Sequence, residues 1–109
     1  MRYSPLLLAF SLLISVSSVV RADDFPTKTI RIINPFPGGP TDSFARLIAS
    51  KLQAGLKQPV IVDGRAGAGG TIGITEAVKA APTGYDMVMG QKDNLVVGPW
   101  LYGNLPWDP

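Results

Sequence analysis

Two glycine-rich stretches carry the residues of this chain that are best suited to binding chemistry. Asn34–Asp42 reads NPFPGGPTD, and Asp63–Thr71 reads DGRAGAGGT. Each follows a short β-branched run and precedes a segment with helical spacing, so each is predicted to be a turn from a strand into a helix. The first N–H groups of a helix lack partners within the helix, and the helix dipole adds partial positive charge there. Together the two turns predict a site for a small organic anion.

The same glycines also fit a purely structural role, because glycine permits tight turns and positive φ angles. Gly39, Thr41 and Thr71 are suited to capping the helices that follow the turns. Arg65 is interpreted as a solvated charge rather than as an anion ligand. The pattern alone does not decide between a ligand-binding site and two turns that have only a structural role.

Other chemistries find less support in the residues. The chain has no histidine and no cysteine, which excludes the usual catalytic triads and thiol chemistry, and we expect no enzyme activity. A dinucleotide-binding pattern that begins at Gly67 and Gly69 would need glycine at position 72, where Ile72 stands, and no Lys-Ser or Lys-Thr follows to make a P-loop. The aspartates show no calcium-loop spacing, so we expect neither metal nor cofactor.

The first 22 residues have the layout of a secretory signal peptide. Arg2 precedes an apolar, serine-containing run from Leu6 to Val20, and Ala22 completes a plausible cleavage site. The apolar run is shorter than the ~18–20 residues that a transmembrane span needs. The sequence therefore predicts export, with cleavage after Ala22.

Charge after cleavage gives no reason to expect a nucleic-acid partner. Two of the ten basic residues, Arg2 and Arg21, belong to the predicted signal peptide, which leaves eight basic against eight acidic residues. Nucleic-acid binding needs a basic face, and a formally neutral chain offers none.

Strand and helix patterns alternate along residues 23–109. The predicted elements are strand Thr29–Asn34, helix Thr41–Leu56, strand Pro59–Asp63, helix Thr71–Ala81, strand Asp86–Gly90, and a short helix in Leu95–Tyr102 that Gly98-Pro99 interrupts. This order predicts an α/β fold, a three-layer parallel sheet with helices on both faces and right-handed crossovers. Ligands of such sheets bind beyond the carboxyl ends of the strands, where the two glycine-rich turns and a third polar turn, Gln91–Asn94, are expected to meet.

Three details of the packing can also be predicted. The first helix has an apolar stripe expected to face the sheet, made of Phe44, Leu47, Ile48, Leu52, Gly55 and Leu56. Arg31 breaks the apolar first strand, so we expect it at a sheet edge or a strand end. Three aromatic residues lie near the C-terminus: Trp100, Tyr102 and Trp107. They could form a surface on which sugars stack, but we favour apolar packing beneath a further segment.

Four segments resemble motifs of the Bug-type periplasmic solute-binding receptors, the extracytoplasmic receptors of tripartite tricarboxylate transporters. Asn34–Asp42 is similar to their PFxPGGPTD turn, and Arg65–Gly73 to their RPGAGGxxG turn. Ala80–Tyr85 is similar to their APDGY turn, and Leu101–Pro109 to their LYxxLPYDP segment. The motifs come in the family's order and cover nearly all of residues 23–109.

The resemblance implies a type 2 periplasmic-binding-protein (Venus-flytrap) fold and a periplasmic receptor without catalysis. It implies a small carboxylate ligand (a di- or tricarboxylate or an acidic amino acid) and a membrane permease as partner. The ligand-binding residues that it implies are Phe36, Gly38, Gly39, Thr41, Asp42, Ala68, Gly69, Gly70, Thr71, Gln91, Asp93 and Asn94.

The sequence also departs from the family pattern. The first turn is one residue short, Gly64 and Ala66 replace the usual Asn and Pro of the second turn, and Thr83 replaces the usual Asp. Family members are roughly three times longer, a size at which chains split into two domains. We therefore expect residues 23–109 to be an incomplete N-terminal ligand-binding domain without the second domain, with weak carboxylate binding or none.

Three alternatives to a working receptor stay open at this point. The chain could be a non-functional remnant of such a receptor. It could be an adaptor domain that pairs with another chain. Least favoured is a small exported α/β nucleotide-binding or enzyme domain, because the glycine spacing and the absence of histidine count against it.

Overall fold

The computed structural model describes residues 24–109, so the predicted signal peptide and its cleavage after Ala22 lie outside the described residues. Strands and helices alternate as predicted, with shifts of one to two residues at most boundaries. The elements are β1 (Ile30–Asn34), α2 (Pro40–Leu56), β2 (Val60–Gly64), the short 3₁₀ turn η1 (Ala68–Gly70), α3 (Thr71–Lys79), β3 (Asp86–Val88), the π-helical turn η2 (Asp93–Val97) and α4 (Gly98–Tyr102).

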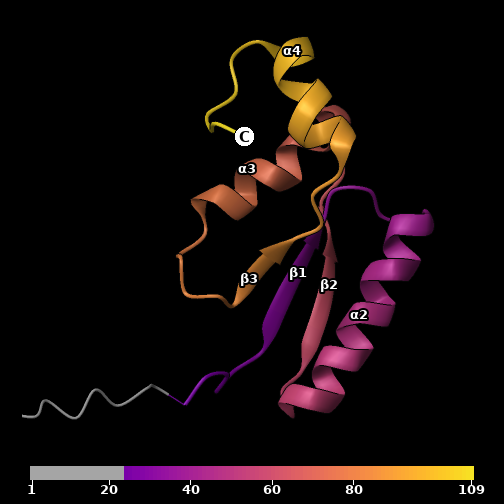
Figure 1. The fold of residues 1–109 in the computed structure, drawn as a ribbon, viewed down its shortest axis with the longest axis vertical. Coiled ribbons are helices and arrows are strands. Elements are labelled where there is room, and N and C mark those ends of the chain that lie inside the picture. Colours follow the sequence, from indigo (N-terminus) through magenta and orange to yellow (C-terminus); the bar gives the residue numbers. More distant parts are fainter. Residues whose placement is uncertain (1–23) are drawn as a thin grey trace, which may run out of the picture.

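The three strands form one parallel sheet in the order β2-β1-β3. The first connection, through α2, leads from β1 to its neighbour β2. The second connection, through α3, leads from β2 past β1 to β3 on the other side. With right-handed crossovers, this reversal places α2 and α3 on opposite faces of the sheet. α2 packs on β1 and β2, α3 packs on β1 and β3, and Figure 1 shows the two helices on either side of the strands. The predicted three-layer parallel α/β architecture is confirmed.

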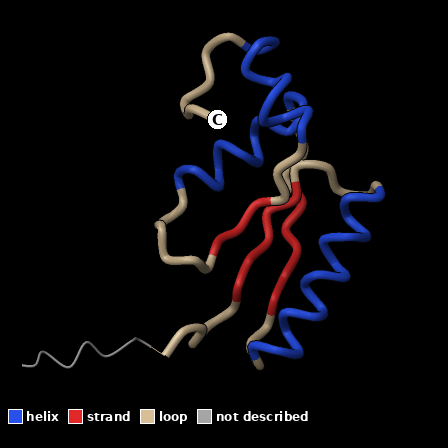
Figure 2. Tube along the Cα trace, in the orientation of Figure 1, coloured by secondary structure: helices blue, strands red, loops and turns tan. Residues whose placement is uncertain are grey.

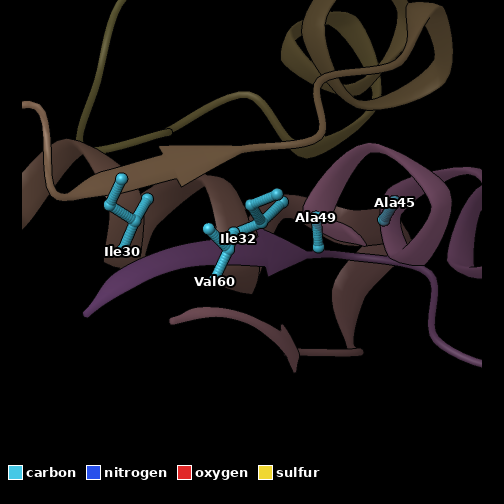
Figure 3. Packing of buried hydrophobic residues seen from close by; sticks show 5 residues of the cluster. All are labelled: Ile30, Ile32, Ala45, Ala49 and Val60. Atoms are coloured by element: carbon cyan, nitrogen blue, oxygen red, sulfur yellow. The ribbon is translucent and has the colours of Figure 1, made fainter. Parts of the chain in front are cut away.

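The apolar core lies between the sheet and α2. Ile30 and Ile32 of β1 pack with Val60 of β2 and with two small residues of α2, Ala45 and Ala49 (Figure 3). Because alanine side chains are short, α2 approaches the strands closely along this line, and burial of the core drives the packing.

This close approach corrects the predicted apolar stripe of α2. Ile48 and Leu52 border the core as expected, but Phe44 and Leu47 are 56% and 57% exposed. The helix is rotated so that its alanines, rather than its largest side chains, face the strands. Helical spacing alone could not distinguish these two rotations.

Arg31 lies in the middle of the central strand, so its predicted place at a sheet edge or a strand end is wrong. On the face covered by α3, its guanidinium contacts Asp63 of β2 at 3.2 Å, Glu76 of α3 at 2.6 Å and Asp86 of β3 at 2.6 Å. Ion pairs with carboxylates from three different elements thus offset the cost of placing a charged arginine in the central strand.

Arg65 belongs to the same ion cluster; its side chain is exposed, as predicted for a solvated charge, but it is also paired with carboxylates. Its guanidinium lies 3.0 Å from Asp63 and 3.2 Å from Glu76. The residue follows β2 directly, and its N–H donates to the carbonyl of Asn34 at 2.8 Å. Arg65 therefore ties the start of the second turn both to β1 and to α3.

The segment after β3 differs most from the prediction. The third turn, Gln91–Asn94, is not a free loop, because a continuous helical segment formed by η2 and α4 already includes Asp93 and Asn94 (Figure 2). The predicted interruption at Gly98-Pro99 is wrong. Pro99 has no N–H to donate, and the turn before it widens so that the Gly98 N–H reaches the carbonyl of Asp93, five residues back.

The C-terminal segment folds back onto α3. The indole N–H of Trp107 donates to Thr75 Oγ1 at 3.0 Å, whereas Trp100 is 89% exposed. Within residues 24–109, no helix combines the length and the apolar character needed to cross a membrane.

Candidate functional site

The first turn is closed by Asn34, a fully buried residue at the carboxyl end of β1. Its Oδ1 accepts from the Phe36 N–H at 3.1 Å, and its Nδ2 donates to Asp42 Oδ1 at 2.9 Å. This is the geometry of an Asx turn extended to the next helix. Asn34 is the first residue of the predicted turn but is not among the predicted ligand-binding residues, although an asparagine at the end of a buried strand and before proline is a recognisable turn signal.

Asp42, a predicted ligand-binding residue, has both carboxylate oxygens engaged within the turn. Oδ1 accepts from Asn34, and Oδ2 accepts from Arg46 Nε at 2.8 Å. Hydrogen bonds from Arg46 and then from Asn34 hold the pKa of Asp42 below its ordinary value. Any contribution of Asp42 to an anion site therefore comes from the turn that it holds and not from its carboxylate.

Gly38 and Gly39 leave open space at the start of α2. Gly38 has a φ of +83°. Gly39 is the N-cap of α2, so of the two predicted caps, Gly39 and Thr41, the first is correct. A Cβ atom built on either glycine would meet no atom within 4 Å. Pro40 follows at the first helical position, where its lack of an N–H is harmless. The backbone here is accessible to a ligand from outside.

The second turn has three successive residues with left-handed backbone: Ala68, Gly69 and Gly70, with φ of 47°, 63° and 88°. Gly70 is the N-cap of α3, so the predicted cap role of Thr71 is wrong. The Thr71 hydroxyl instead donates to the carbonyl of Ala68 at 2.8 Å and holds the turn together. The tight turn directs the N-terminus of α3 toward the carboxyl end of the sheet.

Gly70 brings the second turn against the first and the third. A Cβ atom on Gly70 would lie 2.9 Å from the Phe36 ring and 3.0 Å from Asn94 Nδ2. Only a glycine can therefore occupy this position without displacing its neighbours. Gly69 is similarly close to the Tyr102 hydroxyl, 2.8 Å from a Cβ built there, which places α4 beside the turn; the sequence prediction had not included Tyr102.

The third segment is joined to the first by Gln91, whose side-chain amide donates a hydrogen bond to Thr41 Oγ1. The Gln91 N–H donates to Asn94 Oδ1 at 2.9 Å. Asn94 is 0% exposed, and its Nδ2 has no hydrogen-bond partner among residues 24–109. Asp93 is exposed.

The structure thus brings most of the predicted residues together at the carboxyl edge of the sheet. Direct contacts connect Thr41 to Gln91, and Gly70 lies between Phe36 and Asn94. Gly38, Ala68 and Gly69 are exposed parts of the same turns. The side chains that can serve an anion here are donors, and the helices α2 and α3 both begin at this edge.

Two hollows lie elsewhere in the described structure. One lies beside α2 and β2 and is lined by Arg46, Ala49, Ser50, Gln53, Val60, Ile61 and Val62. The other is lined by Asp24, Phe25, Thr27, Lys28, Thr83 and Tyr85. Neither hollow includes a residue of the glycine-rich turns.

The chain is similar to known proteins in sequence and in fold. The chain is 43% identical over 94 residues to protein BugT of Bordetella pertussis. It is similar to the structure of MatC from Rhodopseudomonas palustris with bound malate (36% identity, TM-score 0.73). It is also similar to that of R. palustris Rpa4515 with adipate (32% identity, TM-score 0.68).

The coverage of these matches is unequal. The BugT match includes 84% of this chain and 29% of BugT, and each structural match includes 78% of this chain and 29% of the other. The chain therefore spans about three-tenths of the length of these relatives. The model of the "Tripartite tricarboxylate transporter family receptor" matches residues 44–109, more than half of the chain. The resemblance seen in the turn motifs is confirmed, and the chain belongs to the tripartite tricarboxylate transporter receptor family.

Proposed function

We propose that this chain takes part in capturing a small organic dicarboxylate in the periplasm and presenting it to the membrane permease of a tripartite transporter. It acts by binding and delivery, without catalysis. Residues 1–22 direct export in this account, and residues 23–109 belong to the N-terminal α/β ligand-binding domain. Membership of the receptor family supports the proposal.

The observation that carries the proposal is the meeting of two helix N-termini with side-chain donors at one edge of the sheet. α2 has 17 residues and α3 has 9, so each is long enough to have a dipole and unpaired N–H groups at its start. The Thr41–Gln91 hydrogen bond and the Phe36–Gly70–Asn94 contact fix these starts relative to one another. Such an arrangement stabilises negative charge.

The ligand class is inferred from two relatives of known structure. MatC is described with bound malate and Rpa4515 with adipate, and both ligands are small dicarboxylates. The residues that we assign to the site are those of the three turns: Phe36, Gly38, Gly39, Thr41, Asp42, Ala68, Gly69, Gly70, Thr71, Gln91, Asp93 and Asn94.

Affinity is expected to be modest. A hydrogen bond to a charged group contributes about 1.5–3 kcal/mol, whereas micromolar binding needs about 8 kcal/mol after the costs of ordering. A few donors at two helix N-termini give less than that, so we expect a dissociation constant of roughly millimolar order.

Thermal unfolding of the chain tests this proposal. Malate, adipate and succinate are added at rising concentration, and ionic strength is matched with sodium chloride. A ligand that binds the folded state raises the Tm progressively with its concentration, so at least one dicarboxylate is expected to do so while the neutral diamide succinamide does not. An unchanged Tm with every acid, up to roughly 50-fold above the expected dissociation constant, would contradict the proposal.

A further inference from the structure

The side-chain amide of Asn94 is held in one orientation by a backbone donor. The Gln91 N–H lies 2.9 Å from Asn94 Oδ1. A backbone N–H can only donate, so the amide oxygen of Asn94 must face Gln91 and the NH₂ group must face the other way. The orientation is thus fixed by chemistry.

The NH₂ group of Asn94 is a buried donor without a partner. Asn94 is 0% exposed, and its Nδ2 has no hydrogen-bond partner among residues 24–109. An unpaired buried donor lowers the stability of a fold. The amide oxygen of Asn94 serves the Gln91 N–H, whereas the NH₂ group makes no such structural bond among residues 24–109.

The unpaired NH₂ group lies beneath the start of α3. A Cβ built on Gly70, the N-cap of that helix, would be 3.0 Å from Asn94 Nδ2 and 2.9 Å from the ring of Phe36. Two independent features therefore favour negative charge at the same place. One is the N-terminus of a nine-residue helix, and the other is a buried donor with no acceptor.

Gln91 also acts on a second donor. Its side-chain NH₂ donates to Thr41 Oγ1, so the hydroxyl oxygen of Thr41 is used as an acceptor. The hydroxyl hydrogen is then available to donate to a ligand. Through its main chain and its side chain, Gln91 thus contacts both Asn94 and Thr41.

We propose that Asn94 is a specificity-determining residue of this site and that Gln91 is the positioning residue that fixes it; this rests on the proposed function. The Asn94 NH₂ group and the N–H groups at the start of α3 are both donors, and together they select an ionised carboxylate, because both oxygens of that group accept. A carboxamide of the same shape has an NH₂ group that would face a donor, so it binds less well. A Cβ built on Gly70 would meet both the Asn94 amide and the half-buried ring of Phe36, so the proposal requires Phe36 to move for a ligand oxygen to reach the amide.

Two substitutions at position 94 test the proposal. Asn94→Leu removes the unpaired donor, and Asn94→Asp keeps the acceptor for the Gln91 N–H while replacing the donor by a second acceptor. Each variant and the wild type are measured by thermal unfolding without ligand and by ¹⁵N NMR titration with succinate and with its monoamide, succinamate. The side-chain NH₂ resonances of Asn94 in the wild type give a direct signal.

The wild type is expected to bind succinate more tightly than succinamate, with a shift of the Asn94 NH₂ resonances. Asn94→Leu loses the unpaired donor and also the acceptor of the Gln91 N–H, so its unfolding temperature should fall only slightly, and the folded variant should bind succinate roughly 10-fold or more weakly. Its preference for succinate over succinamate should shrink. Asn94→Asp should lose succinate binding by roughly 100-fold or more, because an acceptor then faces the carboxylate. The exposed Asn104→Leu variant is the matched control and should change neither property.

Wild-type affinity for succinate retained by Asn94→Leu would overturn the role of Asn94 and leave the proposed function standing. A large fall in the unfolding temperature of Asn94→Leu, with binding reduced only by the unfolded fraction, would show a structural role and overturn the proposal as well. If the wild type binds no dicarboxylate at all, the proposed function fails and this inference fails with it.

Discussion

Asn34 at the end of β1 and Asp42 in the first turn of α2 are joined by a hydrogen bond of 2.9 Å from Nδ2 to Oδ1. The bond spans the glycine-rich turn and fixes the direction in which α2 leaves the sheet. Asp42 is bound on its other oxygen by Arg46. The accessible backbone of Gly38 and Gly39 therefore lies in a turn that its two ends hold in place.

Asp42 gives the fold a defined sensitivity to acid. Because its folded pKa is depressed, first by Arg46 and then by Asn34, its contribution to stability is present above the unfolded pKa of about 4. The contribution is lost as the pH falls through the lower, folded value. We predict that urea unfolding of Asp42→Asn shows a smaller acid-induced loss of stability than the wild type. Parallel pH profiles of wild type and Asp42→Asn would contradict this.

Arg31 is predicted to be a major stabilising residue although it is charged. Arg31→Met would leave the carboxylates of Asp63, Glu76 and Asp86 facing one another without their common cation. Breaking a buried ion pair costs about 3–5 kcal/mol, and these groups keep some solvent, so we expect a loss of about 2 kcal/mol in urea unfolding. The control Arg46→Met, on an arginine that is 64% exposed, should lose about 0.5 kcal/mol.

A second substitution separates charge repulsion from simple loss of packing at this cluster. If repulsion among the carboxylates causes the loss, Asp86→Asn should restore part of the stability of Arg31→Met while destabilising the wild type. Additive effects of the two substitutions would show that the carboxylates do not interact through Arg31.

Gly39→Ala should separate ligand binding from folding. A Cβ at position 39 meets no atom within 4 Å, so the free energy of unfolding should change by about 1 kcal/mol or less. The same Cβ would occupy the space through which a ligand approaches the start of α2, so carboxylate affinity should fall roughly tenfold or more. Gly55→Ala, in the body of α2 and also without neighbours, is the matched control and should bind as the wild type does. Unchanged binding by Gly39→Ala would argue against ligand approach at this turn.

The two tryptophans should differ in their effect on stability. Trp107→Phe removes the hydrogen bond to Thr75 Oγ1 and should lower the free energy of unfolding by about 1 kcal/mol. Trp100→Phe changes a side chain that is 89% exposed and should have little effect. Equal losses in chemical denaturation would show that the C-terminal segment does not depend on this bond.

Local patterns were sufficient to predict the alternation of elements. Short β-branched runs such as Ile30–Asn34, set between glycine- and proline-rich turns, identify parallel strands because such strands are covered on both faces. The parallel sheet and its helices follow from that order. The rotation of α2 did not follow, because Phe44 and Ala45 both lie on an apolar surface and only the packed structure shows which one faces the strands.

Arg31 shows why other parts of the structure could not be predicted. Its partners lie 32, 45 and 55 positions away, and no local pattern reports that they converge. The same holds for the site: the glycines of the turns are visible in the sequence, whereas the unpaired NH₂ group of Asn94 is visible only in the structure. The candidate donor groups are positioned by contacts between the turns, and the composition of the turns does not reveal those contacts.

The central claim is that the three turns together hold a dicarboxylate, and a ¹⁵N NMR titration of the chain with malate tests it most directly. The account predicts that the largest shifts occur at the amides of Gly39, Thr41, Gly70 and Thr71 and at the side-chain NH₂ of Asn94, with one common saturation curve. No shifts at these groups, or shifts confined to the hollow beside Lys28 and Tyr85, would contradict it.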